Sequence, residues 1–247
     1  MSDEFSTVYP YSCEEARSRD QIFLWRESHR ENIACKNAIE EAIRRDFDGM
    51  HLKAECARSV IDQYGFKRVQ RVLANTVQQK SWDGRFSHDN KTWAKSAYIP
   101  PDKNSLTDHN LEYVAESHPA VLDGFINQYR RAYQELGLFG PGQCEPGSEK
   151  LSYEGRVLVL SPDILKESCW SRQDQLWLAT GGFGCAPNSS GRAVFATCLN
   201  DGEKARWNRA DFTGVLRERL LPDWAREKFS ELQEQQPSEG MGGMKME

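Results

Sequence analysis

The stretch GLFGPGQCEPGSEK, residues 137–150, divides the sequence into two parts with different hydrophobic periods. Four of its 14 residues are glycine and two are proline, a composition typical of a connection between domains. Apolar residues recur at helical spacing before it, and form short runs bounded by turn residues after it. We therefore expect an α+β protein with a mainly helical domain at 8–137, a linker at 138–150, a small α+β domain at 151–233 and a disordered tail at 234–247.

The first part predicts an N-terminal bundle of five or six helices. Ser12 and Glu15 have the spacing of a capping box, which predicts a helix start. Gly65 separates two apolar periodic runs and is expected to end the first of them. A helix is expected from Pro119 to residue 136. Residues 82–118 have no sustained period and predict a long irregular segment with one short helix at 90–96.

The second part predicts an antiparallel sheet of about four or five strands followed by a C-terminal helix. Asn200, Asp201 and Gly202 tolerate positive φ and predict the turn of a hairpin. The expected strands are 155–161, 174–180, the hairpin 192–208 and 210–216, and the expected helix is 221–235.

Composition and charge exclude several classes of protein. The net charge is −5, and residues 1–150 and 151–247 each carry slightly more acidic than basic residues. This balance disfavours a polyanionic nucleic-acid mimic and also disfavours nucleic-acid binding by bulk charge. The seven cysteines form no CxxC pair, which predicts reduced thiols and no metal site. The sequence starts without a signal peptide and has no apolar run of about 20 residues, so we expect a cytoplasmic protein without a membrane partner.

The glycine-rich stretch from Trp177 to Leu199 is a possible secondary loop site. Its spacing fits neither a P-loop nor a dinucleotide-binding fingerprint. Three interpretations stay open: an anion site, a cysteine nucleophile, and a connection between two antiparallel strands, which we favour. A zinc site from Cys169, Cys185 and Cys198 lacks the close ligand pairs of structural zinc sites. The residues of the possible loop site are Gly182, Gly184, Cys185, Gly191 and Arg192.

The basic–aromatic segment, residues 66–98, is the main candidate binding surface. It carries seven basic residues against Asp83 and Asp89, a local charge of +5, with five aromatic residues interleaved. Cations that follow phosphates and rings that stack on bases or pack on a partner are typical of a contact surface. The alternative is that the rings anchor a loop while the charges are only solvated. The predicted binding residues are Lys67, Arg68, Arg71, Lys80, Trp82, Arg85, Lys91, Trp93 and Lys95, of which the first three are expected on the outward face of a helix.

Two parts of the sequence resemble an uncharacterised domain family carried on conjugative elements and phages of anaerobic gut bacteria. In the first half the resemblance lies in ACKNAIEEAIRRDFDGMHL (34–52) and YGFKRVQRVLANTVQQKSWDGRFS (64–87). In the second half, VLVLSPDILK (157–166), GGFGCAPNSSGRAVFATCLNDGEKARWNRADFTGVL (181–216) and LPDWAREK (221–228) resemble its usual C-terminal companion segment. Family members also occur as modules of large polyvalent mobile-element proteins. The family has no assigned catalytic residues, and we expect no cofactor.

The resemblance implies a mobile-element accessory protein that acts by protein–protein interaction. The expected partner is a host defence protein or nucleoprotein complex, and the expected effect is inhibition of a defence nuclease, of the anti-CRISPR or anti-restriction type. One alternative is a nucleic-acid-binding protein in element transfer or maintenance, with affinity for naked nucleic acid that falls steeply with salt. A second alternative is an enzyme that uses Cys185 and Arg192.

Overall fold

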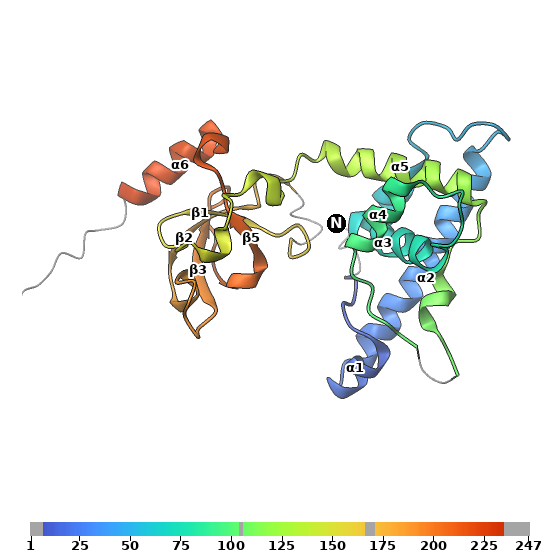
Figure 1. Cartoon of the computed structure of the whole chain (residues 1–247), viewed down its shortest axis with the longest axis horizontal. Coiled ribbons are helices and arrows are strands. Elements are labelled where there is room, and N and C mark those ends of the chain that lie inside the picture. The colour runs from blue at the N-terminus through green and yellow to red at the C-terminus, as the bar shows by residue number, and fades with distance from the viewer. Residues whose placement is uncertain (1–6, 104–105, 166–170, 235–247) are drawn as a thin grey trace, which may run out of the picture. The chain divides into compact units, whose positions relative to one another are not determined.

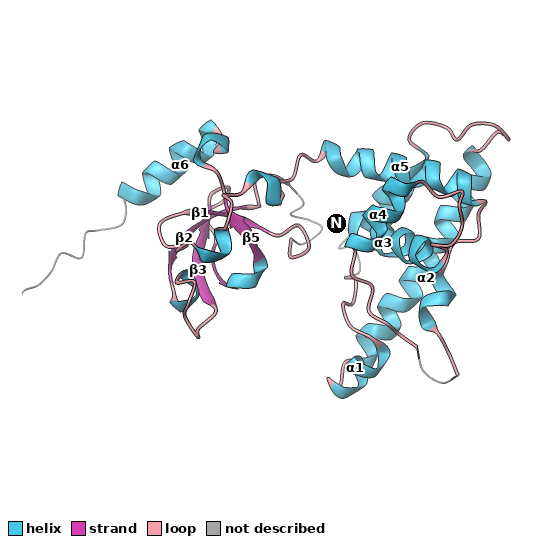
Figure 2. Ribbon diagram, viewed as in Figure 1, coloured by secondary structure: helices cyan, strands magenta, loops and turns pink. Residues whose placement is uncertain are grey.

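A computed structural model describes residues 7–103, 106–165 and 171–234 (Figure 1). The chain divides into two compact units, residues 1–136 and 137–247. The described N-terminal unit is built from helices, and the C-terminal unit holds a five-stranded antiparallel sheet and a terminal helix (Figure 2). The expected α+β class is therefore confirmed.

The N-terminal unit contains five α-helices and one 3-10 helix among the described residues. They are α1 (Cys13–Ser18), α2 (Ile22–Asp46), α3 (Cys56–Gln79), α4 (His88–Ser96), η1 (His109–Tyr113) and α5 (Pro119–Glu135). The Ser12 hydroxyl accepts a hydrogen bond from the Glu15 N–H and the Glu15 carboxylate accepts one from the Ser12 N–H, which confirms the capping box. Gly65 has φ 76° and ψ 160°, a conformation open to glycine, and kinks α3 where we expected a helix to end.

Helix α3 forms the centre of the helical unit. It packs against α2, α4 and α5, and its buried apolar residues, Val69 and Leu73 among them, form the core with residues such as Ile39 and Phe125. Since α3 has neighbours on several sides, more than one of its faces is excluded from water. This packing determines which of the predicted binding residues on α3 are buried.

The sheet of the C-terminal unit has the order β4-β3-β2-β1-β5, and all neighbours are antiparallel. The hairpin between β3 and β4 turns through Gly202, whose φ of 79° confirms the expected turn. The strands are β1 (Val157–Leu160), β2 (Leu176–Gly181), β3 (Ala193–Cys198), β4 (Lys204–Asn208) and β5 (Phe212–Val215), followed by α6 (Asp223–Glu234). Among its described residues this unit also has short 3-10 turns at Pro141–Gln143, Ser148–Lys150, Phe183–Cys185, Arg209–Asp211 and Glu218–Leu220.

Both faces of the sheet are covered by apolar packing. One face holds Leu158, Trp177 and Phe212 in a cluster with Tyr153 and Cys185. The other face packs against α6 and against residues that precede the sheet.

The segment 138–150, which we expected to be a linker, packs onto this second face. The Phe139 ring is buried, and its backbone N–H and C=O both bond to the side-chain amide of Gln175, at 2.6 and 3.0 Å. Cys144 forms a backbone bridge with Leu216. The segment is therefore part of the C-terminal unit.

Two sequence expectations fall outside the described residues: Cys169 and, from residue 235 on, the tail. None of the helices in the described ranges combines the length and the apolar character that a membrane crossing requires.

Candidate functional site

The basic–aromatic segment spans the second half of α3, a loop and α4, and its cations do not all face solvent. Arg68, expected on an outward face, is only 1% exposed. Its guanidinium donates hydrogen bonds to the Ser28 carbonyl at 2.9 Å, to the Asn32 Oδ1 at 2.7 Å and to the Thr7 carbonyl at 3.1 Å. The expected outward orientation of Arg68 is wrong because α2 and the N-terminal segment cover that face of α3.

Two further cations of the segment form hydrogen bonds within the N-terminal unit. Arg71 donates to the backbone carbonyls of Tyr9 and Tyr98, at 3.3 and 3.4 Å. The Lys80 ammonium donates to the Ala115 carbonyl at 2.7 Å. These contacts give the side chains a structural role beside any role in binding.

Arg85 is anchored on Asp83, in the loop between α3 and α4. Its Nη2 and Nε lie 2.7 and 2.9 Å from the buried Asp83 carboxylate, which also accepts the Arg85 backbone N–H. Hydrogen bonds from the Arg85 side chain, with its backbone N–H and the charge of Lys91, hold the pKa of Asp83 well below its usual range.

We use the name Trp82 surface for five side chains of the segment that reach solvent: Trp82, Arg85, Lys91, Lys95 and Tyr98. Trp82 is 80% exposed and Tyr98 is 76% exposed. Arg85 and Lys95 are exposed and Lys91 is half-buried. The remaining predicted residues lie further inward: Lys67 is half-buried on α3, and Trp93 packs on the helical core with its ring 5.7 Å from that of Tyr129.

The glycine-rich loop connects β2 to β3, two antiparallel neighbours, as expected. A Cβ on Gly182 would lie 2.5 Å from the Ala193 carbonyl oxygen, and one on Gly184 would lie 2.4 Å from the Arg192 carbonyl oxygen. A Cβ on Gly191 would lie 2.6 Å from that of Phe183. The glycines therefore let the loop pack closely on itself.

The thiol of Cys185 lies inside this loop. It is buried and donates to the Gly181 carbonyl at 3.1 Å, and burial raises its pKa, the opposite of what a nucleophile needs. The buried Arg209 holds the loop in place by donating hydrogen bonds to the carbonyls of Gly184 and Cys185, at 2.8 and 2.9 Å. Arg192 is exposed at the end of the loop.

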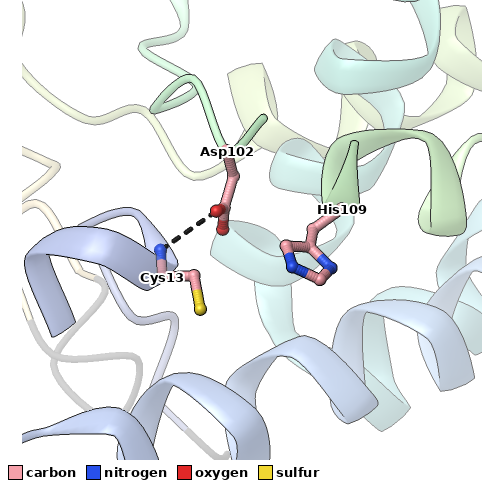
Figure 3. Close-up of side chains that lie close together, drawn as sticks. All are labelled: Cys13, Asp102 and His109. Atoms are coloured by element: carbon pink, nitrogen blue, oxygen red, sulfur yellow. Dashed lines mark hydrogen bonds between the residues drawn. The ribbon is translucent and has the colours of Figure 1, made fainter. Parts of the chain in front are cut away.

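The structure also brings together a histidine–thiol cluster that the sequence analysis missed. We define it as Cys13, Asp102, His109, His29 and Glu112, from α1, α2, η1 and the segment before η1. One ligand atom each from Cys13, Asp102 and His109 lie within 4.8 Å of one another (Figure 3). Ligand atoms of His29, His109 and Glu112 form a second group within the same limit. His109 belongs to both groups and joins them.

Hydrogen bonds orient the members of this cluster. Asp102 accepts the Cys13 backbone N–H at 3.1 Å and the Trp25 indole N–H at 2.8 Å. Glu112 lies with one oxygen 2.9 Å from the His109 Nδ1 and the other 3.0 Å from the His29 Nε2. The two histidines beside Glu112 lower its pKa despite its partial burial, which acts in the opposite direction.

Rings enclose the cluster on one side. The indole of Trp25 stacks on the His29 imidazole at 4.8 Å between centroids with 8° between planes, and it meets the His109 ring edge-on at 5.0 Å. The Cys13 side chain is 5% exposed, and burial raises the pKa of its thiol. No sequence spacing signals this cluster, because Cys13 and Asp102 are 89 positions apart.

A groove of about 700 Å³ lies elsewhere on the N-terminal unit. Ala120, Val121 and Gln128 of α5 form one wall, and Leu52 and Met50 of the loop before α3 form another. Met50 is exposed there, so the groove offers an apolar side chain to solvent.

The comparison with known families agrees with the division into two units. A family model described as "Protein of unknown function (DUF3849)" matches residues 8–134, just over half of the chain, so the chain belongs to this family. The match covers the helical unit, including the Trp82 surface and the histidine–thiol cluster. No curated protein and no solved structure matches the chain.

Proposed function

We propose that the protein acts by binding a protein partner through the Trp82 surface, as an accessory protein of a mobile element. The observation that carries this proposal is the exposed indole of Trp82. Burying this ring against a partner would stabilise the complex by about 25 cal/mol per Å² of apolar surface removed from water. Tryptophan, tyrosine and arginine are also the residues that contribute most to binding in protein interfaces.

The loop that carries Trp82 has a fixed conformation, which supports a preformed binding site. Asp83 and Arg85 are joined by three hydrogen bonds directly after Trp82. The Gln78 side-chain amide, at the end of α3, donates to the carbonyls of Ala94 and Ala97, at 2.7 and 2.9 Å. A fixed loop loses little conformational entropy when a partner binds.

The charge that remains on the surface favours a protein partner over naked nucleic acid. Arg68, Arg71, Lys80 and Arg85 all donate to acceptors within the chain. The affinity for nucleic acid depends on the number of protein cations that reach its phosphates. The exposed Asp89 on α4 further lowers the local positive charge. Because these cations are hydrogen-bonded within the chain, the nucleic-acid alternative is less well supported.

The partner we propose is a host defence nuclease, either a restriction or a CRISPR effector. This choice rests on the resemblance of the sequence to domains carried on conjugative elements and phages. Inhibition of such an enzyme requires a complementary surface and no reaction by the inhibitor itself.

The test is plasmid transformation of cells that carry one defence system each and express the full chain. We expect the protein to raise the number of cells transformed by a targeted plasmid well above the number found without the protein. A surface variant, Trp82→Ala with Lys95→Glu and Tyr98→Ala, should lose this effect. These positions are exposed, so the variant should fold.

The matched control is Phe23→Ala with Leu106→Ala, which removes apolar side chains that are 69% and 94% exposed at other positions. It should protect the plasmid as the parent does. Equal protection by the surface variant, or no protection in any system, would refute the proposal. A gel shift of the parent with short DNA that weakens steeply with salt would support the nucleic-acid alternative instead.

A further inference from the structure

We propose that Cys13, Asp102 and His109 bind one zinc ion. The three side chains come from the start of α1, the segment before η1 and η1 itself, and they converge on one point (Figure 3). They offer a thiol sulfur, a carboxylate oxygen and an imidazole nitrogen, which are the donors that zinc binds in proteins. A site with three protein ligands leaves a fourth position for water.

The spacing of the donors is close to that of a tetrahedral site. Zinc bonds of about 2.0–2.3 Å place neighbouring ligand atoms about 3.3–3.8 Å apart. The three ligand atoms already lie within 4.8 Å of one another. Short side-chain rotations from that upper limit would bring the ligand atoms to zinc-bonding distances.

Hydrogen bonds hold the donors as in known metal sites. Glu112 engages the His109 Nδ1, so Nε2 is the nitrogen that faces Cys13 and Asp102 (Figure 3). A histidine that binds metal through one nitrogen usually donates the other N–H to a carboxylate, which is the role open to Glu112. Asp102 is oriented in turn by the Cys13 N–H and the Trp25 indole N–H.

The same residue types also occur in thiol nucleophile triads, and Glu112 orients the His109 imidazole through Nδ1 as the acid of such a triad does. Here, however, a second carboxylate lies at the same centre: Asp102, fixed by the N–H groups of Cys13 and Trp25, supplies a third metal ligand that a triad does not need. The Cys13 side chain is also nearly closed to solvent, so a substrate could not reach it. A small ion needs no such access.

The zinc would join segments that are distant in the chain. Cys13 belongs to the first helix. Asp102 lies 89 positions later in the chain, and His109 follows it. A bound ion would therefore stabilise the folded N-terminal unit, because the unfolded chain has no preformed site. It would add to the capping box at Ser12 in fixing the first helix.

The experiment uses the full chain, stripped with a chelator and given zinc alone under a thiol-free reductant. We expect about one zinc per chain after desalting. Free zinc at about 100 times the Kd should raise the melting midpoint by about 5–10 °C. Cobalt in place of zinc should give the thiolate-to-metal charge-transfer band in the near ultraviolet.

The ligand variants are Cys13→Ser, Asp102→Asn and His109→Gln. Zinc should not raise the melting midpoint of any of them and none should retain zinc, and Cys13→Ser should lose the cobalt band. Glu112→Gln should bind zinc about 10–100-fold more weakly while the cobalt band remains, because it only positions His109. The controls are His88→Ala, an exposed histidine, and Cys144→Ala, a thiol of the other unit; both should bind like the parent.

Three results would overturn the zinc site. They are a parent protein that retains no zinc, a parent cobalt complex without the thiolate band, and zinc retention that is unchanged in Cys13→Ser and His109→Gln. If one ligand variant fails to fold, the remaining two and the cobalt spectrum of the parent still decide the matter.

Discussion

The guanidinium of Arg68 donates a 2.7 Å hydrogen bond to the Oδ1 of Asn32 inside the helical unit. Both side chains are buried, and the same guanidinium reaches the Ser28 carbonyl on α2. An arginine buried at the junction of two long helices fixes their relative position, because its planar group can satisfy acceptors in only one geometry. Arg68 therefore organises the fold and is not a contact for a partner.

Asn32→Ala should destabilise the N-terminal unit by about 1.5–3 kcal/mol, the range for a hydrogen bond to a charged group. The substitution leaves part of a buried guanidinium without its acceptor. Arg30→Ala, an exposed position on the same helix, should change stability by less than about 0.5 kcal/mol. Urea denaturation followed by helical circular dichroism measures both. Equal stabilities for the two variants would contradict the role given to Arg68.

Asp46 predicts an acid-dependent loss of stability. Hydrogen bonds from the Arg45 guanidinium, with a further one from Lys53, lower the pKa of this carboxyl to about 2 from 3.8. Because the folded-state pKa is the lower one, Asp46 stabilises the fold above about pH 4 and this contribution is lost as pH falls through about 2. Asp46→Asn should be less stable than the parent at neutral pH, and the difference should vanish near pH 2.

The measurement for Asp46 is urea denaturation from about pH 5 to about pH 2. The control is Asp62→Asn, whose exposed carboxylate forms a surface ion pair with Arg58 at 3.4 Å. Such pairs contribute little, so this variant should follow the parent at every pH. A constant gap between Asp46→Asn and the parent across the range would show that the carboxylate is not the source of the pH dependence.

Gly184→Ala should destabilise the C-terminal unit by about 1–3 kcal/mol, as overpacking does. Its new Cβ would meet the Arg192 carbonyl at 2.4 Å, so the loop between β2 and β3 would have to move. Gly142→Ala is the matched control, since its Cβ would meet no atom within 4 Å. Hydrogen exchange of the β2 and β3 amides in urea measures the stability of both variants. Exchange in Gly184→Ala as slow as in the parent would contradict the packing explanation for the glycines.

Arg209→Lys should cost about 2–3 kcal/mol, because one ammonium cannot replace a guanidinium that serves several buried carbonyls. Arg209 donates to Gly184, Cys185, Glu149 and Leu151, and it stacks 3.7 Å from the centre of the Tyr153 ring. Arg206→Lys, an exposed arginine on β4, should be neutral. Thermal melting of the two variants compares them, and similar midpoints would contradict the prediction.

The Cys185 thiol should react with iodoacetamide at least about tenfold more slowly in the native chain than in denaturant. Its burial and its raised pKa both reduce the amount of accessible thiolate. Peptide mapping by mass spectrometry resolves this thiol from the others. Reaction as fast as that of a free cysteine would revive the alternative of an enzyme that uses Cys185 and Arg192.

The sequence predicts features that depend on neighbours in the chain. The capping box at Ser12, the break at Gly65 and the turn at Gly202 each follow from the conformational needs of a few adjacent residues. The same local patterns predict the α+β class and every described strand.

Features that depend on distant residues could not be predicted in this way. Arg68 has helical spacing typical of a polar face, and only the packing of α2 and the N-terminal segment shows that this face is covered. The histidine–thiol cluster arises from four segments that no period or motif connects. The glycine and proline content of residues 138–150 likewise predicted a linker. The burial of Phe139 depends on its distant partner Gln175, which local composition does not reveal.

The bond between Phe139 and Gln175 determines where the chain can be cut. A fragment that starts at residue 151 would leave the Gln175 amide without the Phe139 backbone N–H and C=O, and would uncover apolar side chains on the sheet face behind it. A fragment that starts at Gly137 keeps both. Expression of the sheet unit by itself, for crystallisation or NMR, therefore has to include the glycine- and proline-rich stretch that a sequence-based domain boundary would discard.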